Sequence, residues 1–180
     1  MPRYFAFLRA INVGGHTVKM DRLRELFAGM GFDKVETFIA SGNLIFDARA
    51  GTTRNLERKI EARLNEALGY NVATFIRTEA ELGAIAVYKP FSPAQLAGMA
   101  ALNIAFLAEP LDKVSAKKVM ALRTAIDEFH LQGRELYWLC RKKQSESTFS
   151  NQVLEKTIGR ASTLRGVETI KKLAQKYGNR

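Results

Sequence analysis

The sequence contains one cysteine and two histidines, and these shortages exclude several kinds of site. The single cysteine, Cys140, rules out an intrachain disulfide framework and a zinc centre built from several thiolates. The two histidines, His16 and His130, are too few for a histidine-rich metal centre. We therefore expect neither a metal ion nor a cofactor.

Long apolar runs are missing as well. No segment reaches the roughly 18 consecutive apolar residues of a membrane-spanning helix. The first residues, Met-Pro-Arg and a short mixed run, lack the apolar stretch and the cleavage site of a signal peptide. The sequence predicts a cytoplasmic protein without a membrane partner, and it leaves the oligomeric state open.

Basic residues are abundant and unevenly distributed. The 180 residues include 28 Lys and Arg against 18 Asp and Glu, a formal net charge of +10. Residues 1–88 contribute +2, residues 89–131 contribute +1 and residues 132–180 contribute +7. Such an excess favours solubility and an anionic partner, but it does not indicate a fold.

The first half of the chain alternates between strand and helix patterns. Residues 3–8 are apolar almost throughout, as in a strand covered on both faces, and residues 21–30 repeat with helical spacing. Two β-rich runs flank the turn 41–43, and a helix up to Gly69 precedes a strand at 72–78. We expect Thr53 or Asn55 to cap that second helix.

The second half repeats this order of elements. We expect strands or extended segments over residues 102–107, 126–131, 135–140 and 161–164. Ser115 is the predicted cap of the first helix, and Gly159 is the predicted end of the second. A last helix carries apolar residues from 167 to 177.

Strand, helix, strand, strand, helix, strand is the order of ferredoxin-like folds. We therefore predict an α+β protein of two tandem ferredoxin-like (βαββαβ) units, packed into one compact body, with an extra C-terminal helix. The expected domains are residues 1–78, a linker with a short helix at 79–100, and residues 101–180. Pro90 and Pro93 favour that position for the linker.

The loop between the first strand and the first helix is the strongest candidate ligand site. Two adjacent glycines allow the backbone to approach a ligand, and a helix N-terminus with nearby cations attracts anions. The named phosphate-binding glycine patterns are absent, so a plain turn remains the alternative. The candidate residues in this loop are Arg9, Asn12, Gly14, Gly15 and Lys19.

The turn Ser41-Gly42-Asn43 has two interpretations, of which the plain turn is favoured. As structure, it is a tight hairpin turn that needs its glycine. As function, Ser41 and Asn43 offer hydrogen bonds beside the first loop, provided that turn and loop lie at the same edge of the sheet. Catalytic constellations are scarce, so the sequence does not decide between a binding protein and an enzyme.

Three segments closely resemble the bacterial family called domain of unknown function 1697. The first segment reads Leu-Arg-Ala-Ile-Asn-Val-Gly-Gly from Leu8, and the second reads Ser-Gly-Asn-Leu-Ile-Phe from Ser41. The third, at residues 146–151, resembles the family's E-S-K-F-S-N, with Thr148 in place of lysine. The resemblance extends along essentially the whole chain and implies tandem ferredoxin-like halves without an established activity.

The family's later signature, T-T-R-N-W-N-T-V, is only partly present. Thr163, Arg165 and Thr169 match it, whereas Gly166, Val167 and Glu168 replace Asn, Trp and Asn. If this signature and the earlier E-S-K-F-S-N together line a ligand site in the family, this protein lacks a cation, an aromatic ring and two amides there. Ser147, Thr163 and Arg165 are the candidate contacts that remain.

Two functions follow as hypotheses. The first is binding of a small anionic or phosphorylated ligand at the loop 9–19, with the turn 41–43 beside it. The second, and less favoured, is a nucleic-acid-binding module that uses the basic residues of 132–180, because neutralised phosphates supply much of such affinity. No aromatic RNA-binding pattern supports the second hypothesis.

Overall fold

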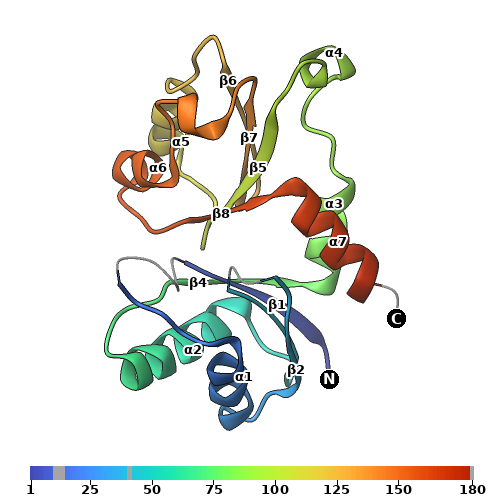
Figure 1. The fold of residues 1–180 in the computed structure, drawn as a ribbon, viewed down its shortest axis with the longest axis vertical. Helices are drawn as coiled ribbons and strands as arrows, with labels where there is room; N and C mark the ends of the chain where they lie inside the picture. The colour runs from blue at the N-terminus through green and yellow to red at the C-terminus, as the bar shows by residue number, and fades with distance from the viewer. Residues whose placement is uncertain (10–14, 40–41, 179–180) are drawn as a thin grey trace. The chain divides into compact units, whose positions relative to one another are not determined.

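The computed structural model describes residues 1–9, 15–39 and 42–178 (Figure 1). It divides into two compact units. Unit 1 comprises Met1–Ile85 together with Leu173–Arg180, and unit 2 comprises Ala86–Lys172.

Unit 1 is a four-stranded antiparallel sheet with two helices on one face. Its strands follow the order β2-β3-β1-β4, and α1 and α2 both lie on the same side of them (Figure 1). The elements are β1 (Arg3–Leu8), α1 (Met20–Gly29), β2 (Asp33–Thr37), β3 (Asn43–Asp47), α2 (Thr53–Leu68) and β4 (Thr74–Thr78). The helix α3 (Glu79–Val87) follows β4.

The first strand is buried on both faces, as its continuous apolar run predicts. Tyr4, Ala6 and Leu8 belong to the core beneath α1 and α2. Phe5 and Phe7 alternate to the other face and are 1% and 0% exposed. Phe5 there meets the ring of Tyr177 edge-on, with centroids 6.3 Å apart.

The ends of α2 show one correct and one wrong prediction. Gly69 ends the helix in the left-handed conformation (φ 82°), as expected. The N-cap is Thr52, whose hydroxyl accepts from the Asn55 amide at 3.2 Å. The predicted caps, Thr53 and Asn55, lie inside the helix instead. The spacing of Leu56 and Ile60 fixes the buried face of a helix but not the residue at which its first turn starts.

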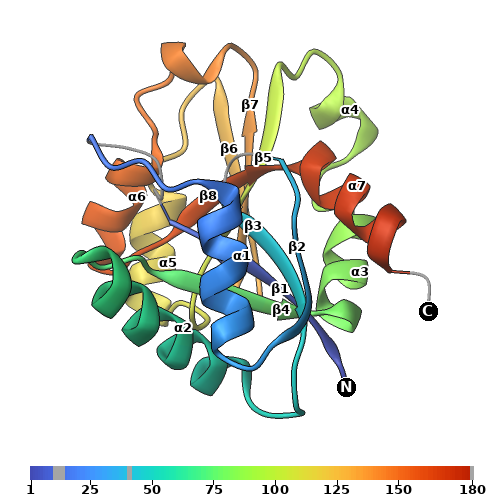
Figure 2. The same cartoon turned by 60° about the horizontal axis from the view of Figure 1, so that its bottom comes forward.

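Unit 2 repeats the architecture of unit 1. Its sheet has the order β6-β7-β5-β8, which is the same second-third-first-fourth arrangement as in unit 1 (Figure 2). The elements are α4 (Pro93–Leu96), β5 (Ala101–Phe106), α5 (Lys113–Met120), β6 (Asp127–Gln132), β7 (Glu135–Cys140), a 3-10 turn (Gln144–Glu146), α6 (Asn151–Ile158) and β8 (Thr163–Gly166). The fold is therefore α+β with two tandem ferredoxin-like units, as predicted.

The helices α5 and α6 of unit 2 begin at polar caps, and α6 ends at a glycine. Asp112 caps α5 by accepting from the Ser115 amide at 2.7 Å, so the prediction of Ser115 as the cap was wrong. An aspartate carboxylate is a stronger acceptor than a serine hydroxyl, and it sets the helix start three residues earlier. Gly159, in the left-handed conformation (φ 67°), ends α6 as predicted.

The predicted C-terminal helix is present as α7 (Val167–Tyr177). The division between the units falls inside it, since residues from Leu173 onward are grouped with unit 1. The Tyr177 hydroxyl donates to the Glu36 carboxylate at 2.7 Å, and its ring meets that of Phe38 edge-on. The last turn of α7 thus packs beside β2 of unit 1.

Candidate functional site

The end of β1 lies between two neighbouring segments of unit 1. The Leu8 amide donates to the Gly42 carbonyl at 2.9 Å, and the Arg9 amide donates to the Ala73 carbonyl at 2.9 Å. The turn between β2 and β3 therefore lies beside the start of the loop that follows β1. Two of the sequence-predicted residues, Arg9 and Gly42, come to the same end of the sheet.

The hairpin turn uses its own polar side chain. Asn43 is 1% exposed, and its Nδ2 donates to the Phe38 carbonyl at 2.9 Å. Gly42 adopts a φ of 78°, which favours glycine over residues with a side chain. Asn43 therefore contributes a hydrogen bond that closes the turn.

The helix α1 starts without a side-chain cap. Lys19 occupies the N-cap position with an extended backbone (φ −68°, ψ 144°), and its side chain makes no capping hydrogen bond. First-turn amides have no acceptor within the helix and carry partial positive charge. Asp21 in that turn is held in an ion pair with Arg24. The exposed Lys19 therefore adds its positive charge to an already electropositive helix end.

The segment before α1 is attached to unit 1 by an aromatic contact. The His16 ring stacks on the Tyr70 ring, with centroids 3.9 Å apart. Val18, 6% exposed, contributes to the core, whereas Gly15 is exposed and has a φ of 84°. The loop thus approaches the helix along a defined path from residue 15 onward.

Three of the residues predicted for this site, Asn12, Gly14 and Ser41, lie outside the described residues. The described part of the predicted site consists of Arg9, Gly15, Lys19, Gly42 and Asn43.

Ser147, which the sequence offered as a ligand contact, belongs to a buried polar cluster in unit 2. Its Oγ donates to the Asp127 carboxylate at 2.8 Å and accepts from the Phe149 amide at 3.0 Å. The same carboxylate accepts from Trp138 Nε1 at 2.8 Å and from Thr124 Oγ1 at 2.7 Å. Ser147 therefore anchors the segment before α6 to the start of β6.

The electrostatics of this cluster favour the carboxylate form of Asp127. Burial acts to raise the pKa of Asp127, but the hydrogen bonds from Trp138, Thr124 and Ser147 outweigh it and hold that pKa below its ordinary value. Burial raises the pKa of the neighbouring Cys140 thiol. Cys140 is 0% exposed and belongs to the core of unit 2.

Thr163 and Arg165 lie together on β8, where they are 4% and 8% exposed. Arg165 Nη1 donates to Thr163 Oγ1 at 2.7 Å and to the Leu164 carbonyl at 2.8 Å. Burial lowers the pKa of Arg165 to about 10. These two residues and Ser147 belong to unit 2, whereas Arg9, Lys19 and Gly42 belong to unit 1.

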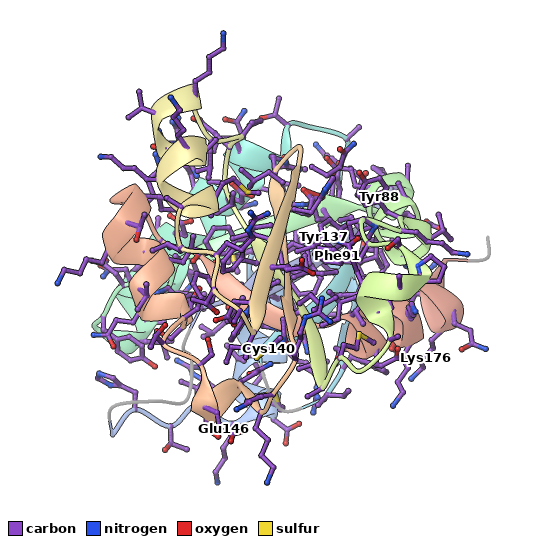
Figure 3. The ribbon with its side chains drawn as sticks, turned by 90° about the horizontal axis from the view of Figure 1, so that it is seen from above. Tyr88, Phe91, Tyr137, Cys140, Glu146 and Lys176 are labelled. Carbon is purple, nitrogen blue, oxygen red and sulfur yellow. The ribbon has the colours of Figure 1, made fainter. Side chains whose placement is uncertain are left out.

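Unit 2 also contains an aromatic cluster that the sequence did not reveal. The Tyr88 hydroxyl and His130 Nε2 are 2.8 Å apart, and the Tyr88 ring lies 5.4 Å from that of Tyr137. Phe91 meets His130 edge-on, and Figure 3 shows Tyr88, Phe91 and Tyr137 near one another. Burial, with nearby Glu135, raises the pKa of Tyr137. The signal was the alternation of β6 and β7, which puts His130 and Tyr137 on one face, but nothing in sequence places Tyr88 there.

Several of the basic residues counted in 132–180 have partners within unit 2. Arg141 forms an ion pair with Glu128 at 3.0 Å and donates to the Gln95 carbonyl, and Arg160 forms an ion pair with Asp112 at 3.7 Å. Lys171 pairs with Glu168 at 3.7 Å. A part of the excess charge in this region is therefore balanced locally.

Metal sites and membrane spans were also sought in residues 1–9, 15–39 and 42–178. Within these residues, His, Cys, Asp and Glu side chains do not gather in groups of three or more that could hold a metal ion. No helix of this part of the chain has both the length and the apolar character to cross a membrane.

Comparison with known proteins gives the family. The sequence model of a family described as "Protein of unknown function (DUF1697)" matches residues 1–137. The chain belongs to the DUF1697 family. The match includes the loop after β1 and the turn before β3, and it ends within β7, before Ser147, Thr163 and Arg165.

One solved structure is similar over the full length. It is described as that of conserved bacterial protein SP0830 from Streptococcus pneumoniae, with a TM-score of 0.81 and 22% sequence identity. The similarity covers 99% of each chain. At this identity the likeness shows the fold alone. No curated protein matches the chain.

Proposed function

We propose that unit 1 binds a small anionic or phosphorylated ligand where β1 leads into α1. The binding groups among the described residues are the first-turn amides of α1, Lys19 and Arg9, with the Gly42 turn beside them. Anions are stabilised at helix N-termini because backbone N–H groups and the helix dipole act together.

The observation that carries the proposal is the contrast between α1 and its counterpart α5. Each helix follows the first strand of its unit. At α5, the Asp112 carboxylate accepts from the Ser115 amide at 2.7 Å, and this backbone hydrogen bond lowers the pKa of Asp112. At α1, Lys19 stands in the cap position and makes no capping hydrogen bond. Unit 2 fills its helix end with a carboxylate of its own, and unit 1 offers a cation instead.

The hairpin beside the loop gives further support. Ile39 precedes the turn with a φ of 57° and is 53% exposed. A β-branched residue rarely adopts this conformation, and strain of this kind is concentrated at binding and catalytic sites. An exposed, strained apolar side chain at this turn is suited to contact with the non-ionic part of a ligand.

The test is calorimetric titration with inorganic phosphate and pyrophosphate at constant ionic strength. We expect binding by the unaltered chain and at least a tenfold loss of affinity for Lys19→Asp, since the new carboxylate would occupy the amides. Lys142→Asp makes the same charge change at an exposed position of unit 2 and serves as the matched control.

Two results would overturn the proposal. One is absence of heat and of thermal stabilisation with both anions. The other is an equal loss of affinity in Lys19→Asp and Lys142→Asp, which would trace binding to net charge alone. Arg9→Gln provides an additional arm, with weaker binding expected because the guanidinium lies at the end of β1.

Nucleic-acid binding by the basic residues of 132–180 stays a prediction of the sequence. The described contacts give it no specific support, because Arg141, Arg160 and Arg165 are engaged or buried within unit 2. We therefore propose no second function.

A further inference from the structure

A cavity of about 460 Å³ opens in unit 1 at the C-terminal end of α1. It is bounded by that helix end, the start of β2, the segment after β3 and the first turns of α2. Its lining includes Met30, Phe32, Asp33, Arg49, Leu56 and Lys59. This volume is within the range of about 300–1,000 Å³ typical of small-molecule sites.

The cavity lies at the opposite end of the sheet from the proposed anion site. Arg3 pairs with Asp47 at one end of the β1–β3 ladder, and Phe7 pairs with Asn43 at the other. Arg49 comes shortly after Asp47, whereas Gly42 directly precedes Asn43. The two places can therefore be altered separately.

The charge of Lys59 lies against the apolar ring of Phe32 at the wall of the cavity. Lys59 Nζ donates to the Met30 carbonyl at 2.9 Å and lies 5.0 Å above the Phe32 ring. It thereby offsets the partial negative charge at the C-terminal end of α1, which would otherwise repel an anion. The lysine also holds its charge at the cavity wall.

Arg49 is the cationic side chain of the lining that is available to bind a ligand. Within the described part of the chain its guanidinium has neither a hydrogen bond nor an ion pair, and its side chain is exposed. The lining thus carries two cations, Arg49 and Lys59, against the single carboxylate of Asp33. A guanidinium binds carboxylate and phosphate oxygens through two parallel hydrogen bonds.

We infer that this cavity binds a small organic anion with an apolar body. The acidic group of the ligand pairs with Arg49, and the nearby positive charge of Lys59 also attracts it. The body of the ligand packs on Met30 and Leu56, which are both half-buried, and apolar surface leaves water there. Inorganic phosphate lacks such a body, so the ligand class differs from that required by the α1 N-terminus alone.

The test uses the full chain and three probes with the same alkyl body: octanoate, octanol and octylammonium. Titration is followed in amide correlation NMR spectra. We expect octanoate to shift the amides of residues 30–33, 48–49 and 56–59, and to bind at least tenfold more tightly than octanol or octylammonium. Arg49→Gln should lose at least tenfold in octanoate affinity.

Arg63→Gln is the matched control, because Arg63 is a half-buried arginine of α2 outside the cavity, paired with Glu66 at 3.8 Å. It should bind octanoate as the unaltered chain does. Equal affinity for octanol and octanoate, shifts centred elsewhere, or full affinity in Arg49→Gln would each overturn the inference. Lys19→Asp should leave octanoate binding intact, and Arg49→Gln should leave phosphate binding intact, so the two proposals fail independently.

Discussion

Unit 1 and unit 2 share a strand order but place their polar side chains differently. In unit 2, the polar residues Asp127, Ser147 and Trp138 bond to one another inside the unit. In unit 1, the loop at the end of β1 has cations and a helix end without a side-chain cap. These polar side chains of unit 2 therefore bond to one another, whereas the start of α1 in unit 1 has no side-chain cap.

The first residue of each second strand makes the contrast concrete. Both second strands begin with aspartate, Asp33 in β2 and Asp127 in β6. Asp33 is exposed, whereas Asp127 is 0% exposed and accepts three side-chain hydrogen bonds. Asp127 pairs with Cys140 of the core, whereas Asp33 pairs with Asp47, so an aspartate at the start of the second strand is structural in unit 2 and exposed in unit 1.

The largest expected effect is the loss of the Asp127 carboxylate. Asp127→Ala should destabilise unit 2 by about 3 kcal/mol, because it leaves the buried Trp138 Nε1 without its acceptor and removes the hydrogen bonds of the Thr124 and Ser147 hydroxyls. Asp33→Ala should cost about 0.5 kcal/mol or less. Urea unfolding followed by the fluorescence of Trp138, the single tryptophan, measures the first, and circular dichroism measures the second. Similar costs for the two variants would refute the contrast.

The same carboxylate should make unit 2 sensitive to acid. The pKa of Asp127 is lower in the folded state than in an unfolded chain, so its contribution is complete above about pH 4 and is lost as the pH falls through the folded-state pKa. Between pH 5 and pH 2 the unaltered chain should lose more stability than Asp127→Asn does. A parallel pH dependence in both would argue against this role of Asp127.

Exchange of the helix caps should change the stability of each unit by less than the loss of Asp127 does. Lys19→Asp should stabilise unit 1 by about 1 kcal/mol, because an aspartate cap satisfies first-turn amides. Asp112→Lys should act in the opposite direction on unit 2. Hydrogen exchange of the α1 and α5 amides measures both effects, and destabilisation by Lys19→Asp would be inconsistent with an uncapped α1.

The smallest effect concerns Asn103 of unit 2, whose neighbour on β8 is a glycine. Asn103 and Gly166 pair on β5 and β8, as Tyr4 and Thr78 pair on β1 and β4. Among the residues that the structure describes, Asn103 Nδ2 has no hydrogen-bond partner although it is buried, and a Cβ on Gly166 would stay 3.8 Å from Asn103 Oδ1. Gly166→Thr should add up to about 1 kcal/mol through an acceptor for Nδ2. Gly166→Ala is the control, because it changes the backbone freedom without adding a hydroxyl. If urea unfolding gives both variants the same gain in unfolding free energy, the hydrogen bond is excluded.

The order of strands and helices could be predicted from sequence because burial periodicity and glycine helix ends are local properties. The duplicated strand order and the end of α6 at Gly159 are confirmed on that basis. Caps were predicted less well: Thr52 and Asp112 compete with nearby Ser, Thr and Asn residues that have similar local preferences.

The hydrogen bonds among these polar side chains could not be predicted, because each joins residues that are far apart in the sequence. Ser147 bonds to Asp127, 20 residues away, and Tyr88 bonds to His130, 42 residues away. The candidate loop at Arg9 was predictable from its glycines and charge, whereas its proximity to Gly42 required the antiparallel pairing of β1 with β3.

The most direct test of the contrast between the two units is an amide correlation NMR titration of the full chain with inorganic phosphate. We expect shifts at the amides of residues 20–23, at the start of α1, and none at residues 113–116, where Asp112 already supplies the acceptor. Lys19→Asp should abolish the shifts at 20–23. Equal shifts at both helix ends, or shifts at 20–23 that persist in Lys19→Asp, would contradict the account.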